Sequence, residues 1–202
     1  MDQPETGNKK NLIYAIVLII GVIVIAIVVS EFRPKSLKEQ KEIPQTKVEE
    51  KLPYNMQITS PDFKNNEKIP SRFTCDGEGI APDIEISDVP RDAKSLALIM
   101  DDPDAPSGEF LHWIMWNIKP DTKKIGNNNT DRAVVGKTDA GDFGYTGPCP
   151  PKGTHHYRFT LYALDKTLDI NINSSKSDLD SAMKEHVLDE AILVGLYQLT
   201  RI

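Results

Sequence analysis

An unbroken apolar run from Leu12 to Val29 places the strongest constraint on how this chain folds. About 18 residues, each rising about 1.5 Å along a helix, extend roughly 27 Å, close to the hydrocarbon thickness of a bilayer. The flanks of the run are polar, which argues against a helix buried in a protein core. The apolar part of a secretory signal is shorter, about 7–15 residues, and Val28-Val29-Ser30 is a weak cleavage site. We predict a transmembrane helix over residues 12–30, after a polar tail at residues 1–11. A cleaved signal peptide is the alternative.

The next segment, residues 31–52, is rich in Glu, Lys, Gln and Pro and nearly lacks aromatic residues. Such a composition buries too little apolar surface to become ordered, so we predict a flexible charged stalk. Residues 53–202 are numerous enough for one globular domain with its own core. Acidic residues outnumber basic ones there, and the whole chain has a formal charge of −6. This balance argues against nucleic acid as a partner of the domain.

Signals for the side of the membrane conflict. Lys and Arg are more numerous after the apolar run than before it, which favours a cytoplasmic domain. Residues 9–10, both Lys, directly precede the run, as in a secretory signal. The pair Cys75 and Cys149 is compatible with one disulfide or with two thiols, and N-x-S/T sequons begin at Asn128 and Asn173. We expect a single-pass membrane protein with an extracytoplasmic domain.

Short apolar or alternating stretches separated by Pro and Gly predict strands in the domain. Residues 95–100 form a continuous apolar run, as expected for a strand buried on both faces. Residues 157–164 alternate, which places Tyr157 and Phe159 on one face. The predicted strands cover residues 56–59, 84–86, 95–100, 112–118, 157–164 and 191–197.

One helix is predicted near the C-terminus. Ser177 and Asp180 form an S-x-x-D capping-box pattern, and Leu179, Met183 and Val187 follow at helical spacing. Many strands with one helix indicate a mainly β domain. We predict a two-sheet antiparallel β-sandwich-like fold with a peripheral C-terminal helix.

The first segment with chemical potential is DPDAPSGEFLHW, residues 102–113. Asp102 and Asp104 follow a predicted strand and His112 begins the next, so a connecting loop brings them to one end of the sheet. A carboxylate bonded to one imidazole nitrogen fixes the tautomer and directs the other nitrogen outward. The alternative is a tight loop whose Asp side chains bond their own backbone.

The second segment is GPCPPKGTHHY, residues 147–157. Its proline density forbids strand pairing, and main-chain amides without internal partners suit an anionic oxygen. His155 and Tyr157 point to one face of the strand that follows, and His156 points to the other. An imidazole and a phenol near free amides form a candidate oxyanion or phosphate seat. The alternative is a pair of polar-tipped core residues.

Other chemistries leave weaker signals. A G-x-S-x-G nucleophile elbow is absent from the sequence, and Cys149 is a poor nucleophile because of its flanking prolines and the bridge it can form. Two His and one Asp could form a facial metal triad, which sequence does not distinguish from an anion pocket. We expect no metal, no cofactor and no catalytic residue.

These two segments resemble those of the phosphatidylethanolamine-binding protein family, also called Raf kinase inhibitor-like, and most closely its bacterial and archaeal branch. In that family D-P-D-x-P leads to His-Trp or His-His, and G-P-P-x-G leads to His-x-Tyr. The stretches FTCDGEGIAPDI, residues 73–84, and YALD, residues 162–165, are also similar to that branch. The resemblance runs from about Met56 to Ile202 and does not cover the predicted anchor or stalk.

The resemblance implies a two-sheet β fold with a small anion-binding pocket, and it also suggests a cis bond at Ala105-Pro106. The loop before His112 is shorter than in animal members and lacks an equivalent of their pocket tyrosine, which puts phosphotyrosine-sized or lipid-headgroup ligands in doubt. The ligand-binding residues implied are Asp102, Asp104, His112, Cys149, Pro150, Pro151, His155 and Tyr157.

Three functions follow, in order of preference. The first is a membrane-anchored, non-enzymatic binding or regulatory protein whose pocket holds a phosphate or phospho-headgroup. The second is an inhibitor of a peptidase or kinase that acts on its protein target through surface loops. The third is a metal-assisted hydrolase.

Overall fold

The computed structural model describes residues 55–126 and 132–200. The predicted tail, transmembrane helix and stalk, and the sequon at Asn128, lie outside the described residues. Within the described part, no helix is both long enough and apolar enough to cross a membrane. The elements, in chain order, are β1 (Gln57–Thr59), β2 (Glu67–Lys68), the 3-10 helix η1 (Ser71–Phe73), β3 (Ile84–Ser87), β4 (Ser95–Asp102), β5 (Phe110–Ile118), β6 (Lys124–Ile125), β7 (Val134–Val135), β8 (His155–Leu164), α2 (Lys176–Met183) and β9 (Val187–Tyr197).

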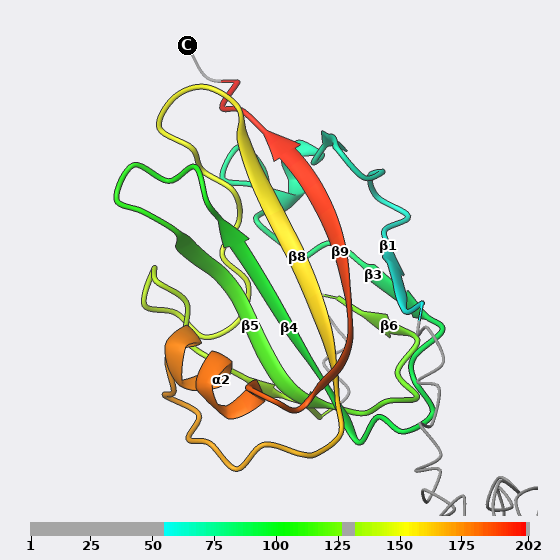
Figure 1. Ribbon diagram of the computed structural model, residues 1–202. Helices are drawn as coiled ribbons and strands as arrows, with labels where there is room; N and C mark the ends of the chain where they lie inside the picture. Colours follow the sequence, from blue (N-terminus) through cyan, green and yellow to red (C-terminus); the bar gives the residue numbers. More distant parts are fainter. Residues whose placement is uncertain (1–54, 127–131, 201–202) are drawn as a thin grey trace, which may run out of the picture. The chain divides into compact units, whose positions relative to one another are not determined.

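The strands form two sheets, as predicted. The smaller sheet has the order β1-β3-β6 and the larger one has the order β2-β9-β8-β4-β5-β7. In Figure 1 the long strands β4, β5, β8 and β9 cross the molecule side by side, and β1, β3 and β6 lie to one side of them. The pairings are antiparallel except that of β2 with β9, which is parallel and corrects the prediction of purely antiparallel sheets.

The central strand β4 shows why its sequence is apolar throughout. All eight of its residues are buried. Leu96, Leu98 and Met100 belong to the main core, together with Ile58 and Ile86 of the small sheet. The alternate residues of β4 face the other way, into a second cluster that includes side chains of α2. The strand is therefore covered by a sheet on one face and a helix on the other, and both faces need apolar residues.

The helix α2 is shorter and begins earlier than predicted. Its N-cap is Ser175, whose hydroxyl accepts a hydrogen bond from the Asp178 N–H, while the Asp178 carboxylate accepts one from the Ser175 N–H. The chain contains two overlapping S-x-x-D patterns, and the structure uses the first, not the one at Ser177. The helix ends at Met183 because the next residue, Lys184, has a non-helical ψ of 130°; Glu185 then adopts a positive φ of 67°, and Val187 begins β9 instead of continuing the helix.

Candidate functional site

The predicted site residues gather because antiparallel neighbours place opposite chain ends together. Asp102 is the last residue of β4, His112 lies near the start of β5, and His155 is the first residue of β8. Strand β4 pairs with both β5 and β8, so its C-terminal end adjoins the N-terminal ends of its two neighbours. This strand order brings together two sequence segments that are far apart in the chain.

A cavity of about 180 Å³ opens at this end of the large sheet. The strands contribute its polar groups, and two proline-containing loops form its walls. The lining residues are Asp102, Ala105, Pro106, Ser107, Phe110, His112, Thr146, Gly147, Cys149, Pro150, Pro151, His155 and Tyr157.

The pair His155 and Asp102 forms the most buried polar contact of the site. Nδ1 of His155 lies 2.7 Å from Oδ2 of Asp102, and the two side chains are only 7% and 5% exposed. A carboxylate cannot donate, so Nδ1 carries the proton and donates it. The other carboxylate oxygen, Oδ1, accepts a hydrogen bond of 2.9 Å from the Asp104 N–H. Both oxygens of Asp102 are therefore engaged, and Nε2 of His155 is left for a ligand.

A second imidazole, that of His112, is oriented by the main chain. Its Nδ1 donates to the carbonyl oxygen of Thr146 at 2.8 Å, and the Thr146 N–H donates to the His112 carbonyl oxygen at 2.8 Å. Burial lowers the pKa of His112, against the opposing influence of the Thr146 hydrogen bond and the negative charge of Asp102. The ring is therefore neutral at pH 7, with an unprotonated Nε2.

Tyr157 supplies a buried hydroxyl beside the two imidazoles. Its side chain is fully buried, and its hydroxyl makes no hydrogen bond within the described part of the chain. Burial, and then the charge of Asp102, raise the pKa of this phenol well above its ordinary value, so it stays protonated and can donate. Its ring packs edge-on against His112, with centroids 5.2 Å apart, and stacks on His155 at 6.5 Å. A buried unsatisfied hydroxyl costs about 1–3 kcal/mol, which a ligand oxygen would recover.

The proline-rich wall of the cavity is fixed to another loop. Cys149 forms a disulfide with Cys75, and the Cys75 N–H donates to the carbonyl oxygen of Pro148 at 3.1 Å. Gly147 runs close to this neighbouring segment, because a Cβ there would lie 2.9 Å from the Phe73 carbonyl oxygen. The predicted lining residues Cys149, Pro150 and Pro151 are therefore held in place from outside the cavity.

Asp104 does not join the other predicted residues. Its carboxylate accepts hydrogen bonds from the Nδ1 and the main-chain N–H of His156, at 2.7 and 2.8 Å. These hydrogen bonds lower the pKa of Asp104. Both side chains are exposed, 41% for Asp104 and 54% for His156, on the side of β8 that faces away from the cavity. The structure gives Asp104 the role of fastening the loop after β4 to β8, and Asp104 is not among the residues that line the cavity.

Several lining residues were not predicted. Phe110 and Thr146 are the clearest, since the ring of Phe110 packs against His112 at 4.8 Å and Thr146 orients that imidazole. No sequence signal pointed to a main-chain carbonyl as the partner of His112. Ala105 and Pro106 also line the cavity, but no cis peptide bond is present among the described residues, so the expected cis bond between them is wrong.

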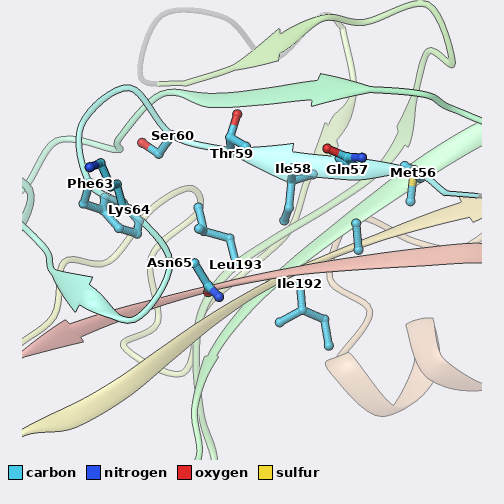
Figure 2. A pocket seen from close by; sticks show the side chains of 11 residues that line it. Met56, Gln57, Ile58, Thr59, Ser60, Phe63, Lys64, Asn65, Ile192 and Leu193 are labelled. Carbon is cyan, nitrogen blue, oxygen red and sulfur yellow. The ribbon is translucent and has the colours of Figure 1, made fainter.

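A second hollow, of about 360 Å³, opens between β1 and β9, as Figure 2 shows. Its lining is mostly apolar or amide-bearing and includes one ionisable side chain, Lys64. Such a surface can pack against apolar groups of a partner, but it contains no acid–base pair. In the described part of the chain, no group of three His, Cys, Asp or Glu side chains is arranged to hold a metal ion. The cavity beside Tyr157 is thus the better candidate for chemical recognition.

Comparison with known proteins decides the family. The family model described as phosphatidylethanolamine-binding protein matches residues 59–198. The chain belongs to the phosphatidylethanolamine-binding protein family. The match includes every residue that lines the cavity and begins beyond the predicted anchor and stalk.

Relatives within this phosphatidylethanolamine-binding protein family support the assignment. A UPF0098 protein of Methanothermobacter thermautotrophicus is 49% identical over 149 residues, which cover 71% of this chain and 99% of that protein. The crystal structure of a putative family homologue from Chlamydia trachomatis is 40% identical, with a TM-score of 0.69 over 72% of this chain and 99% of that one. YbcL of E. coli, described as a new member of the mammalian family, is 28% identical, with a TM-score of 0.66 and the same coverage.

Proposed function

We propose that this chain is a membrane-anchored, non-enzymatic binding and regulatory protein whose cavity holds a small anionic group, a phosphate or a phospho-headgroup. The buried Tyr157 hydroxyl carries the proposal: it lies beside two oriented imidazoles and has no hydrogen-bond partner among the residues that the structure describes. The name of the family, phosphatidylethanolamine-binding protein, agrees with a ligand of this kind.

The hydrogen-bonding groups favour an anion over a neutral ligand. Tyr157 donates, and Nε2 of each histidine also donates once the ring is protonated. An aspartate beside an anion would repel it, but both carboxylate oxygens of Asp102 already accept hydrogen bonds, one from the His155 Nδ1–H and one from the Asp104 N–H. An anion therefore meets the Tyr157 donor in the neutral site and the two Nε2–H donors after the imidazoles take up protons, while the carboxylate oxygens are turned to other partners.

The same geometry favours binding over catalysis. Cys149 is tied up in a disulfide and offers no thiolate. Ser107 also lines the cavity, but the described structure gives it no hydrogen bond to either histidine. A hydroxyl nucleophile needs a base within hydrogen-bonding reach, and among the described residues no Ser or Thr hydroxyl is hydrogen-bonded to His155 to complete a triad with Asp102.

Calorimetric titration of the full chain tests the proposal. Phosphate, sulfate and phosphoethanolamine are expected to bind with one-to-one stoichiometry, and ethanolamine, which lacks the phosphate, is not. Phosphate has few atoms, so a ceiling of about 1.5 kcal/mol per heavy atom limits its Kd to roughly micromolar or weaker. Absence of binding by all three anions at millimolar concentrations would overturn the proposed function.

The membrane anchor belongs to the same proposal. The apolar run at residues 12–29 is long enough to span a bilayer, and the disulfide between Cys75 and Cys149 suits an oxidising, extracytoplasmic location. The full chain is expected to remain with membranes in alkaline carbonate, whereas a chain lacking residues 1–30 is released. Protease added outside intact cells should cleave the domain; protection until lysis would place it in the cytoplasm.

A protein target is the second candidate, and the hollow between β1 and β9 favours it. Ile192 of β9 is 51% exposed, and the hollow beside it is lined by apolar side chains that include Phe63 and Leu193 (Figure 2). Inhibition of a peptidase or kinase through this surface would be lost in Ile192→Asp and retained in His155→Asn. The reverse pattern would assign the regulatory effect to the anion cavity.

A further inference from the structure

The proline-rich part of one wall of the anion cavity is tied to the turn that contains Cys75. Thr146, Gly147 and residues 149–151 all line the cavity. Proline at three of the positions from 148 to 151 removes most main-chain donors from this wall. In the described structure, the one main-chain hydrogen bond from residues 147–151 to another segment runs from Cys75 N–H to Pro148 O. The disulfide from Cys149 reaches the same residue, Cys75.

The segment on the other side of this fastening is well held. Asp76, next to Cys75, accepts hydrogen bonds from the Tyr197 hydroxyl at 2.6 Å and from the Thr200 N–H at 3.0 Å. Thr74 caps the preceding turn, because its hydroxyl donates to Ser71 O at 2.9 Å. Cys75 therefore belongs to a turn that is anchored to the end of β9. The disulfide ties the proline-rich wall to this anchored turn.

The wall also controls one of the imidazoles. The carbonyl oxygen of Thr146, at the start of the wall, accepts the hydrogen bond from Nδ1 of His112. A shift of the wall would thus change both the width of the cavity and the orientation of that ring. The groups on β8, His155 and Tyr157, would stay in place, since β8 pairs along its length with β9.

We propose that the Cys75–Cys149 disulfide is a redox switch that sets the anion affinity of the cavity. A dithiol reductant supplies two electrons and two protons, which convert the disulfide to two thiols, and the dithiol itself is oxidised to a cyclic disulfide. The freed wall then loses its covalent anchor, the cavity loosens, and the anion is released. This inference rests on the proposed anion binding and adds a condition under which it occurs.

The experiment compares phosphate affinity in the oxidised and reduced full chain. Dithiothreitol is the reductant, since it is uncharged and cannot compete for an anion site. Phosphate is expected to bind at least tenfold more weakly after reduction, and diamide reoxidation should restore the original affinity. The double variant Cys75→Ser/Cys149→Ser should match the reduced protein and show no response to dithiothreitol, which controls for direct effects of the reagent.

The outcomes separate this inference from the proposed function. If the oxidised protein does not bind phosphate, the proposed function fails, and the switch fails with it. If both states bind phosphate equally, the switch alone is overturned. Circular dichroism during the titration shows whether the reduced protein keeps its fold; global unfolding would also overturn the switch, because the bond would then maintain the fold and not the cavity. If the double variant fails to fold, the recovery of phosphate affinity on reoxidation of the wild-type chain still tests the switch.

Discussion

His155 Nδ1 donates to Asp102 Oδ2 at 2.7 Å, across 53 residues of sequence, and both side chains are buried. Strand order explains the contact, since β4 ends where its antiparallel partner β8 begins. The bond leaves Nε2 as the nitrogen available to a ligand and engages one carboxylate oxygen of Asp102.

Two adjacent histidines provide a matched test of the site. His155→Asn keeps an amide donor near the position of Nδ1, so Asp102 retains a partner, but it removes Nε2. Sulfate affinity is expected to fall about tenfold or more, since a hydrogen bond to a charged group contributes about 1.5–3 kcal/mol. His156→Asn, on the opposite face of β8, is expected to change affinity less than about twofold. Calorimetry on both variants checks this, and an equal loss in the two would contradict the assignment.

Replacing the Tyr157 hydroxyl should separate binding from stability. Tyr157→Phe is expected to weaken sulfate binding about tenfold or more, because the buried donor is lost. The same variant should unfold no more easily than the wild type in urea, and it should gain up to about 1–3 kcal/mol if the unpartnered hydroxyl is a cost in the empty cavity. A clear loss of stability without a loss of affinity would mean that the hydroxyl serves the fold.

Anion binding should strengthen as the solution becomes more acidic. Burial lowers the pKa of His112 in the empty cavity, and a bound anion stabilises the imidazolium and raises it again. Binding therefore takes up a proton, so affinity rises as pH falls through the pKa of the complex. Sulfate is the suitable probe because it does not titrate between pH 5.5 and 8, whereas the second pKa of a phosphate ester is about 6. Equal sulfate affinity at those two pH values would count against the account.

Without ligand, the free energy of unfolding should fall as the solution becomes more acidic, which is the opposite of the trend in anion affinity. Because the folded-state pKa of His112 lies below its unfolded value of about 6.5, the unfolded chain binds more protons at mildly acid pH. The His112 contribution is fully present above that unfolded pKa and is lost as pH falls below it. Urea unfolding at pH 5.5 and 7.5 measures the loss, and saturating sulfate should reduce it. A larger loss of unfolding free energy in the presence of sulfate than in its absence would contradict this prediction.

The close approach of Gly147 to the neighbouring turn gives a structural test of the cavity wall. A Cβ at this position would lie 2.9 Å from Phe73 O and 3.1 Å from Thr74 Cα, so Gly147→Ala must displace the wall. We expect a loss of about 1–3 kcal/mol in unfolding free energy and weaker sulfate binding. Gly153→Ala is the control. Its φ of +71° makes alanine unfavourable there too, but a Cβ at this position would meet no neighbouring atom within 4 Å, so it would not displace the wall. Similar losses of affinity in both variants would contradict the role of the wall.

Local sequence patterns predicted where the main strands lie and which segments carry the polar groups of the site. They did not predict which of two neighbouring side chains points into the cavity. The apolar run at residues 95–100 and the alternation at residues 157–164 predicted β4 and β8 because burial on one or two faces imposes those patterns. Motif residues such as Asp104 lie within the same stretch as Asp102, and nothing local says which of the two turns inward. The structure decides this through the bonds of Asp104 to His156.

Features that depend on tertiary contacts could not be predicted from the sequence. The partner of His112 is the carbonyl oxygen of Thr146, and every residue has such a group, so composition carries no signal for it. The helix start was equally ambiguous, since two S-x-x-D patterns overlap and only the structure shows that the capping box forms between Ser175 and Asp178.

Sulfate soaked into crystals of the oxidised protein tests the central claim most directly. The account predicts difference density for one sulfate in the cavity, with an oxygen about 2.7–2.8 Å from Tyr157 Oη and another within hydrogen-bonding distance of Nε2 of His112 or His155. An empty cavity at saturating sulfate, with Tyr157 Oη turned to a protein partner, would contradict it.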